Sequence, residues 1–582
     1  MKTLILLFTI IFIPEISFPQ TFFEKETTGA IVQNFNFNHI MAWGDYDNDN
    51  DQDVMINGLN DQCSTCYMPI IFLRNEGNGN FIRIYDNPIA QTFITGSGMA
   101  WGDYDNDGWL DLFICATLNA RNRLFHNDGN GNFTEILTGV IVTEMNSSQS
   151  CNWVDYNKDG WLDLYVTNRY GIYSNRLYKN NGDGTFTKIL SGSIVNDIGE
   201  SRGSTWGDYD NDGWPDLFVV NFGGQNDFLY HNNGNGTFTR IFNLPMVNYA
   251  AWGSSCHWVD FDNNGWIDLF VTNNNSANRL YYNHGDGNFT LSNSLLSQKV
   301  NGLGFTWGDY DNDGLTDLFL CDWYGTNTLY KNQGGSMFVR VSNEIPSQEG
   351  LHSSTAAFTD IDLDGKLDLL VANRLDNPFN YQYNNIGNTG NYLTIQLKGH
   401  ASNKNGVGAK IKIVIGNTPQ YKELLLGSNG HNSGSTLWPH FGIGNNQGVD
   451  SIIVNWPSGA VTRSGYVNGN RIVIIDEDFG VIGINEENIT AVQYNLYQNF
   501  PNPFNPSTKI KFEIAKNSFT ELSIYDVNGR KIETLVNEFK RPGSYEIEFN
   551  SNNSVRNLSS GIYFYKLSAG DYVSTQKMIL IK

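Results

Sequence analysis

The stretch W-G-D-Y-D-N-D-G-W-L-D-L-F, residues 101–113, sets the pattern from which the fold can be inferred. Four aspartates stand at positions 1, 3, 5 and 9 of one loop: Asp103, Asp105, Asp107 and Asp111. Carboxylates this close repel one another unless a cation lies among them, and oxygen ligands with Gly108 at position 6 suit calcium. An EF-hand would need Glu at position 12, where this chain has Ile114, and the apolar residues from Leu112 onward predict a buried strand. The stretch therefore predicts a calcium loop between two β-strands.

The loop occurs seven times, at intervals of 49 to 58 residues. An aromatic residue opens each copy: Trp43, Trp101, Trp153, Trp206, Trp258, Trp307 and Phe358. A second motif, N-x-G-x-G-x-F, follows each loop and places glycines where a hairpin needs positive φ. Its asparagine recurs, more loosely in the last copy, at Asn75, Asn127, Asn180, Asn232, Asn283, Asn332 and Asn385. A repeat of about 50 residues is typical of solenoids and propellers.

Each repeat predicts four strands: one ending at the motif aromatic, one after the loop, one carrying the L-Y pair and one starting at the motif Phe. Seven such repeats predict an all-β, seven-bladed β-propeller, because propeller blades are four-stranded sheets. A β-solenoid would show shorter repeats and capping units. Phe23 precedes Trp43 by 20 residues, the usual spacing between the motif Phe and the next aromatic. The strand at Phe23 is therefore expected to complete the last blade and leave no open edge.

These motifs resemble the FG-GAP/VCBS repeats of integrin α-subunit propellers and of many secreted bacterial proteins, over residues 22–391. The resemblance implies calcium held by the side chains at positions 1, 3, 5 and 9 of each loop. The implied ligands are, repeat by repeat, Asp45, Asp47, Asp49 and Asp53; Asp103, Asp105, Asp107 and Asp111; Asp155, Asn157, Asp159 and Asp163; Asp208, Asp210, Asp212 and Asp216; Asp260, Asp262, Asn264 and Asp268; Asp309, Asp311, Asp313 and Asp317; and Asp360, Asp362, Asp364 and Asp368. The first loop has Asn50 in place of glycine and Asp51 as an extra carboxylate. The alternative is a metal-free cluster of Asx turns, which seven loops in register disfavour.

Two further residue types at the loops have simple interpretations. Position 7 is tryptophan in four repeats: Trp109, Trp161, Trp214 and Trp266. A carbohydrate platform is one interpretation of these rings; we favour packing between blades, with the position-7 carbonyl as a calcium ligand. His126 and His231 occupy the variable position of L-Y-x-N and are interpreted as ordinary surface residues.

The composition and the N-terminus indicate an exported protein. The 37 Lys and Arg residues against 60 Asp and Glu give a net charge of −23, and no basic stripe exists, so nucleic acid is not expected as a partner. Residues 1–20, with Lys2 before an apolar run from Leu4 to Ile13, have the layout of a secretory signal peptide. No other apolar stretch is long enough to span a bilayer. We expect a secreted or outer-cell-surface protein without a transmembrane anchor.

Two different patterns follow the repeat domain of residues 21–391. Residues 392–478 contain N-G-V-G-A-K, H-F-G-I-G and W-P-S-G and resemble the ASPIC/UnbV domain, which implies a small β domain without a defined chemistry. Residues 479–493 are predicted to be a linker. Residues 494–582, with N-P-F-N-P-S-T at 502–508, resemble the type A C-terminal sorting domain of the type IX secretion system, an Ig-like β-sandwich. That resemblance implies the type IX secretion machinery as a partner.

The chain has six cysteines, and two of them stand close together in an insertion. Tyr67 follows Cys63-Ser-Thr-Cys66 where c-type haem attachment would need His, and the pair offers too few ligands for zinc. A local disulfide is therefore the favoured state of Cys63 and Cys66 in an exported protein.

The other four cysteines stand at two places of the repeat. Cys115 and Cys321 lie four residues after the position-9 aspartate, and Cys151 and Cys256 lie two residues before the motif Trp. A bridge between successive blades is possible only for Cys115 with Cys151. The places equivalent to the missing partners hold other residues: Val220 and Ala356. Cys256 and Cys321 are therefore expected to be free or buried thiols.

Two classes of function remain. The propeller could bind a glycan or protein through loops on one face, or it could be a polysaccharide-degrading enzyme with its active site at the propeller mouth, and the fold does not discriminate between them. An enzyme should show acid, base or nucleophile groups that break the repeat. The sequence has no G-x-S-x-G elbow and no H-E-x-x-H, and almost every carboxylate cluster belongs to the repeat. Binding is favoured, with Ca²⁺ as cofactor and an extracellular glycan or protein as partner.

Overall fold

The computed structural model describes residues 21–582 apart from 34–37, 59–67, 78, 130, 170–173, 293–295, 297–300, 336, 351, 375–378, 388, 428–435, 486–493, 515–517, 541–542, 552–557 and 571. Strands dominate it, and its helices are short, such as α1 (Val140–Thr143) and α2 (Ser193–Asn196). None of the helices in these ranges is long and apolar enough to cross a membrane. The chain divides into two compact units, residues 1–482 and 483–582.

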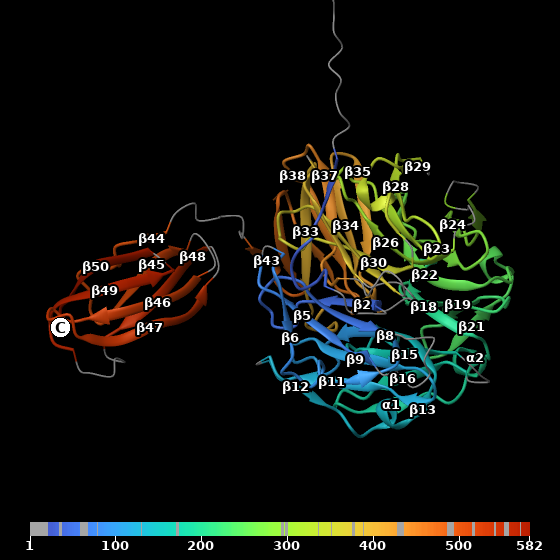
Figure 1. Ribbon diagram of the computed structural model, residues 1–582, viewed down its shortest axis with the longest axis horizontal. Coiled ribbons are helices and arrows are strands. Elements are labelled where there is room, and N and C mark those ends of the chain that lie inside the picture. Colours follow the sequence, from blue (N-terminus) through green and yellow to red (C-terminus); the bar gives the residue numbers. More distant parts are fainter. Residues whose placement is uncertain are drawn as a thin grey trace, which may run out of the picture. The chain divides into compact units, whose positions relative to one another are not determined.

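The described part of the repeat region forms seven antiparallel sheets with four repeat strands each (Figure 1). The first strands are β2 (Asn38–Gly44), β8 (Gly96–Gly102), β14 (Ser148–Val154), β18 (Ser201–Gly207), β22 (Gly253–Val259), β26 (Gly302–Gly308) and β30 (Ser353–Thr359). The second strands are β3 (Asp53–Gly58), β9 (Asp111–Ala116), β15 (Asp163–Asn168), β19 (Asp216–Asn221), β23 (Asp268–Asn273), β27 (Asp317–Asp322) and β31 (Asp368–Asn373). The third strands are β5 (Ile71–Asn75), β11 (Arg123–Asn127), β16 (Arg176–Asn180), β20 (Phe228–Asn232), β24 (Arg279–Asn283), β28 (Thr328–Asn332) and β32 (Tyr381–Asn385). The fourth strands are β6 (Phe81–Ile84), β12 (Phe133–Glu135), β17 (Phe186–Lys188), β21 (Phe238–Ile241), β25 (Phe289–Leu291), β29 (Phe338–Val341) and β1 (Phe23–Lys25).

The strand boundaries follow the sequence motifs. Every second strand begins at the position-9 aspartate, every third strand ends at the motif asparagine, and every fourth strand begins at the motif phenylalanine. The hairpin glycines have positive φ, for example 77° at both Gly129 and Gly131, which confirms their predicted role. The predicted all-β fold built from four-stranded propeller-type sheets is confirmed.

The N-terminal strand completes the last sheet, as predicted. Phe23 of β1 pairs with Asn385 of β32, although the two residues stand at opposite ends of the repeat region. One carboxylate oxygen of Glu344 accepts hydrogen bonds from the backbone N–H groups of Phe22 at 2.9 Å and Phe23 at 3.2 Å. The Phe23 ring is 1% exposed and packs against Tyr310. These contacts fix β1 along what would otherwise be a free edge.

Successive sheets pack through the motif aromatic, which is the next-to-last residue of each first strand and is tryptophan in all sheets but the seventh. The Trp101 indole N–H donates to the carbonyl of Ala42 at 3.3 Å, and its ring lies against Gly44 of the preceding sheet. A Cβ at Gly44 would stand 2.9 Å from the Trp101 ring. The glycine after the motif Trp in W-G-D-Y therefore makes room for the next sheet's indole, which explains the W-G pair.

Residues 391–485 form two further sheets, and all but the last three of these residues belong to the first unit. One contains β37 (His440–Gly444), β33 (Asn391–Lys398), β42 (Arg471–Asp476) and β43 (Gly480–Asn485); the other contains β35 (Thr418–Glu423), β34 (Lys410–Ile415), β39 (Ser451–Asn455) and β40 (Val461–Arg463). An apolar core containing Ile395, Ile413 and Val473 joins them. Residues 480–485, predicted as the start of a linker, extend the first of these sheets as β43. We call residues 391–485 the small domain.

The second unit is a separate two-sheet structure. Its sheets contain β44 (Asn495–Leu496), β45 (Ser507–Ile514) and β48 (Gly543–Asn550), and β47 (Lys531–Lys540), β46 (Ser518–Tyr525), β49 (Gly561–Ala569) and β50 (Tyr572–Leu580). One apolar core takes side chains from both sheets, among them Phe512 and Tyr565. This arrangement agrees with the predicted β-sandwich.

The structure places four cysteines as buried, unbridged thiols. Cys256 and Cys321 are 0% exposed, which confirms the prediction for them. Cys115 and Cys151 are hydrogen-bonded to each other and not covalently joined. Cys63 and Cys66 lie outside the described residues.

We predict that Phe23→Ala destabilises the repeat domain by about 3–5 kcal/mol, the usual cost of truncating a buried phenylalanine. Removal of residues 21–28 should destabilise it further, because it opens the edge of β32. Urea unfolding monitored by tryptophan fluorescence measures both. The control is Glu24→Ala on the exposed face of the same strand. Equal midpoints for the Phe23 and Glu24 variants would contradict the role of β1.

Candidate functional site: the acidic loops

The acidic loops, which run from the position-1 to the position-9 aspartate of each repeat, are shaped by hydrogen bonds to their own carboxylates. In the second repeat, Asp103 accepts from the backbone N–H groups of Asp107 at 3.0 Å and Gly108 at 2.9 Å. Asp107 accepts from the N–H of Trp109 at 2.9 Å. Gly108 has a φ of 94°, which glycine adopts without strain. Position 6 is therefore glycine because the chain turns there toward the position-1 carboxylate.

The position-9 aspartate connects the loop to the third strand of its sheet. Asp111 accepts hydrogen bonds from the N–H of Asn127 at 2.8 Å and from the N–H of Tyr104 at 3.2 Å. The Asn127 side chain donates to the carbonyl of Tyr46 in the preceding loop at 2.8 Å. The same bond from the motif asparagine to position 2 of the preceding loop occurs in every sheet, and Asn75 of the first sheet donates to Ile361 of the last at 2.8 Å.

The loops bring the predicted carboxylates together. Oxygen atoms from positions 1, 3 and 9 lie within 4.8 Å of one another in at least three of the described loops: Asp45, Asp47 and Asp53; Asp103, Asp105 and Asp111; Asp208, Asp210 and Asp216. Position 5 is more exposed than positions 1 and 9, as Asp107 shows beside the buried Asp103 and Asp111. Because acidic groups can also cluster without an ion, the convergence shows the geometry of a site and not its occupant.

The electrostatics of the loops favour a bound cation. Burial, with the neighbouring carboxylates, raises the pKa of Asp103 to about 8 and that of Asp111 to about 7. Burial likewise raises the pKa of Asp53 and Asp368 well above the usual range. A cation among these groups would favour their ionised forms and reverse the shifts.

A second observation that favours a bound cation is a set of buried carboxylate oxygens that have no hydrogen-bond partner in the described residues. They belong to Asp105, Asp163, Asp208, Asp216, Asp268, Asp311 and Asp360. A buried oxygen of an acidic group is costly when it has neither a donor nor a cation. The residues therefore fit a hard divalent cation with oxygen ligands.

The variable residue of L-Y-x-N supplies a cation to the loop in several sheets, which corrects the interpretation of His126 and His231 as ordinary surface residues. His126 Nδ1 lies 3.1 Å from Asp111 and 3.3 Å from Asp105, and the Asp111 hydrogen bond raises the His126 pKa to about 9. His231 contacts Asp210 and Asp216 in the same way, and lysines fill the place elsewhere: Lys179 beside Asp159, and Lys331 beside Asp311 and Asp313. The signal was present in the sequence, because an antiparallel third strand places this residue beside the position-9 aspartate.

The position-7 tryptophans contact a glycine of their own sheet, which the sequence did not predict, and Trp214 also lies beside Lys158 of the preceding loop. Each ring covers the first hairpin glycine of its own sheet: Trp109 on Gly129, Trp161 on Gly182, Trp214 on Gly234 and Trp266 on Gly285. A Cβ at Gly129 would stand 2.4 Å from Trp109 Nε1. The hairpin position is therefore glycine for two reasons: its φ is positive, and the covering indole leaves no room for a Cβ.

The small domain lies on the acidic loops. Lys410 Nζ binds Asp208 at 2.6 Å in the fourth loop, and the Lys404 N–H donates to Asn106 at 3.1 Å in the second. Its contacts reach further loops: Ala401 against Gly160, Tyr421 against Gly265, and Tyr392 against Gly365. Strand β36 (Leu426–Gly427) pairs with Asn152 and Trp153 and extends the third repeat sheet. This coverage was not predicted from the sequence.

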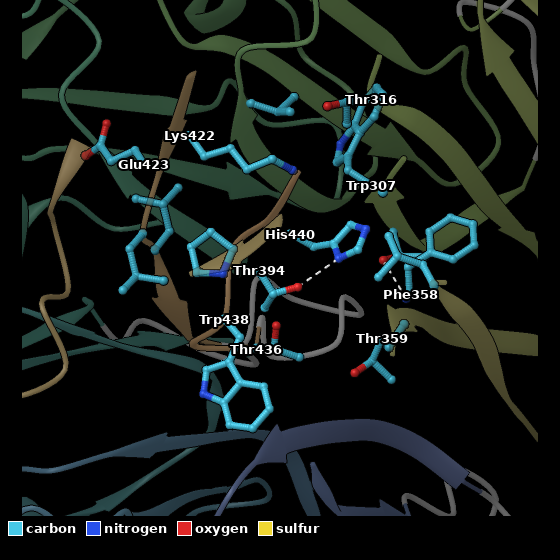
Figure 2. A pocket seen from close by; sticks show the side chains of 18 of the residues that line it. Trp307, Thr316, Phe358, Thr359, Thr394, Lys422, Glu423, Thr436, Trp438 and His440 are labelled. Atoms are coloured by element: carbon cyan, nitrogen blue, oxygen red, sulfur yellow. Dashed lines mark hydrogen bonds between the residues drawn. The ribbon is translucent and has the colours of Figure 1, made fainter. Parts of the chain in front are cut away.

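A cavity of about 200 Å³ remains between the small domain and the first strands of the repeat sheets. His440 stands at its wall, with Nδ1 bonded to Thr394 at 3.0 Å (Figure 2). Its Nε2 is bonded to Asn312 of the sixth loop at 2.7 Å. Burial lowers the His440 pKa to about 3, so the ring is neutral. Its two hydrogen bonds link the small domain to the sixth loop. Lys422 points into the same space, toward His440 and Trp307 (Figure 2). The H-F-G-I-G motif is therefore a docking segment.

Three families match consecutive parts of the chain. FG-GAP-like repeats match in six overlapping segments from residue 45 to residue 371. The ASPIC and UnbV family matches residues 399–480. The secretion system C-terminal sorting domain matches residues 498–582.

Relatives that match more than half of the chain are distant from it in sequence. Cartilage acidic protein 1 of Xenopus tropicalis is 23% identical over 490 residues, which cover 75% of this chain and 73% of the relative. The Mus musculus protein of the same name is 23% identical over 408 residues, 63% of this chain and 62% of the relative. A crystal structure of BBS1N in complex with ARL6DN aligns with 12% identity and a TM-score of 0.40, over 63% of this chain and 98% of that one.

We predict that Gly442→Ala loosens the small domain from the loops. A Cβ at this position would stand 2.0 Å from a carboxylate oxygen of Asp309, so the two surfaces must separate. Hydrogen exchange should increase in β37 and in the sixth loop. The matched control is Gly465→Ala in the same domain, where a Cβ meets nothing within 4 Å. Unchanged exchange in the Gly442 variant would contradict the docking role of this motif.

Proposed function

Because the chain belongs to the family of FG-GAP-like repeat proteins and ends in a secretion system C-terminal sorting domain, we propose that its repeat domain binds calcium and recognises an extracellular glycan or protein. The sorting domain supports secretion or export to the outer surface. In this proposal residues 1–20 are a signal peptide removed on export, and residues 494–582 engage the type IX secretion machinery. Residues 21–391 and 392–478 form the exported part.

Calcium would be held by the side chains at positions 1, 3, 5 and 9 of each acidic loop. The observation that carries this assignment is the set of buried carboxylate oxygens that no hydrogen bond satisfies. A bound calcium would neutralise converging carboxylates and stiffen each loop. Stiff loops also hold the motif asparagine and the small domain in place, because both contact the loops directly.

The recognition surface in this proposal is the end of the repeat domain away from the acidic loops, since the small domain covers the loop end. Trp252 precedes β22, whose other end leads into the fifth loop, and Tyr324 follows β27, which begins at a position-9 aspartate. Trp252 is 46% and Tyr324 62% exposed. The neighbouring Phe222 ring supports Trp252 from a centroid distance of 4.8 Å and is itself stacked by Arg202. Exposed aromatic side chains held in fixed positions are typical of recognition surfaces.

This surface is not a product of the repeat. Trp252 and Tyr324 stand at places that other repeats fill with unrelated residues, such as Ser147 and Leu118. Because these exposed aromatic side chains occur in some sheets and not in others, they distinguish one part of the repeat domain's surface from the rest. That asymmetry supports recognition of a single partner.

The calcium assignment can be tested by removing the ion with a chelator. We predict that excess chelator lowers the melting temperature of the full chain, because an ion that binds only the folded state stabilises it by mass action. Asp103→Ala should remove part of the calcium-dependent increase, whereas Asp86→Ala, an exposed aspartate outside the loops, should leave it unchanged. Identical melting curves with calcium and with chelator would contradict the assignment.

Recognition is tested on glycan arrays and on immobilised extracellular matrix proteins. We expect binding in calcium that the double variant Trp252→Ala and Tyr324→Ala reduces at least tenfold, the usual effect of losing two aromatic anchors. The control is Tyr466→Ala, which removes an exposed aromatic ring of the small domain. Cleavage of an array polysaccharide would instead indicate an enzyme. Binding that is lost only in Tyr466→Ala would indicate that the recognition surface lies on the small domain.

A further inference from the structure

Cys115 and Cys151 meet at the contact between the second and third repeat sheets. Cys115 lies on β9 and Cys151 on the neighbouring first strand, β14. Their thiols are hydrogen-bonded to each other. Both are 0% exposed and belong to one apolar cluster. Two sulfur atoms in hydrogen-bond contact need little movement to reach bonding distance.

The equivalent places also lie near each other at two other sheet boundaries. In the fourth and fifth sheets the equivalent residues are Val220 and Cys256, and the Val220 backbone hydrogen-bonds with the Cys256 sulfur. In the sixth and seventh sheets they are Cys321 and Ala356, which share a core cluster. The repeat therefore brings these two places together at more than one boundary. Among the described cysteines, only the second and third sheets place sulfur on both sides of it.

We propose that Cys115 and Cys151 form a disulfide that joins the second and third repeat sheets in the exported protein. The oxidant is the disulfide of a thiol–disulfide exchange protein or of glutathione. The Cys115 thiolate attacks one sulfur of that disulfide and expels a thiolate, and the Cys151 thiolate then attacks the Cys115 sulfur and expels the second. The two cysteines lose two electrons, the oxidant gains them, and both protons end on the two released thiols.

The bond must form while the sheets are still assembling. In the folded domain both sulfurs are shielded from any oxidant, and burial raises the pKa of the Cys115 thiol far above its usual range. A chain that folds reduced therefore keeps its thiols even when an oxidant is added later. The redox state of the pair records the conditions under which the chain folded.

Mass mapping of the full chain tests the proposal. The chain is refolded with oxidised and reduced glutathione, denatured in an alkylating reagent without reductant, and cut with trypsin. Cys115 falls in peptide 84–121, Cys151 in peptide 124–158, and Cys63 and Cys66 together in peptide 26–74. We expect peptides 84–121 and 124–158 to be linked. Alkylation of both cysteines, or a link from either of them to peptide 26–74, would overturn the proposal.

Thermal melting distinguishes stabilisation by the disulfide from stabilisation by the packing of the two thiols. Chain refolded in dithiothreitol should melt on the order of 5 °C lower than chain refolded in the glutathione buffer. Because dithiothreitol also reduces a Cys63–Cys66 bridge, the comparison is made in a chain that carries Cys63→Ser and Cys66→Ser. In that background Cys115→Ser and Cys151→Ser should each remove the difference, while Cys256→Ser and Cys321→Ser, equally buried in other sheets, should keep it. A difference that persists in Cys115→Ser would overturn the proposal. The mapping of the unaltered chain stands even if a serine variant fails to fold.

Discussion

The hydrogen bond from each motif asparagine to the preceding acidic loop is the interaction on which the repeat domain depends. Its side-chain N–H donates across the sheet boundary, while its backbone N–H donates to the position-9 aspartate of its own sheet. One residue therefore ties the loop of one sheet to the loop of the next. Because the bonds run through all seven sheets and from Asn75 back to Ile361, the position of each loop depends on its neighbours. Apolar packing alone, being non-directional, would not set this register.

The same loops combine a structural and an electrostatic role. Their carboxylates accept the backbone bonds that shape the turn, and the oxygens left over converge on one point. The histidines and lysines of the third strands compensate part of the charge, so an individual loop differs in how much it depends on a metal ion. In the sixth loop the cation is Lys331 of the third strand, whereas in the seventh Asn384 takes that place and Lys366 of the loop itself pairs with Asp364.

Much of the fold follows from the sequence because its signals are local and repeated. The strands begin and end at motif residues, and the 20-residue spacing places Phe23 on the last sheet. The convergence of the loop carboxylates follows in the same way. The docking of the small domain does not, since it rests on pairs such as His440 with Asn312 and Lys410 with Asp208, each unique and far apart in the chain. The contact of the position-7 tryptophan with the first hairpin glycine was not predicted either, because a glycine carries no side-chain signal.

Strand β36 has a consequence for symmetry. Seven similar sheets present seven nearly equivalent rotational settings to any domain placed on their common end. The small domain occupies one setting, because Leu426 and Gly427 add to the third sheet and to no other described sheet. That single strand pair therefore fixes the orientation of the small domain about the repeat domain. The non-repeating aromatic residues at the opposite end therefore keep a fixed angular relation to the small domain.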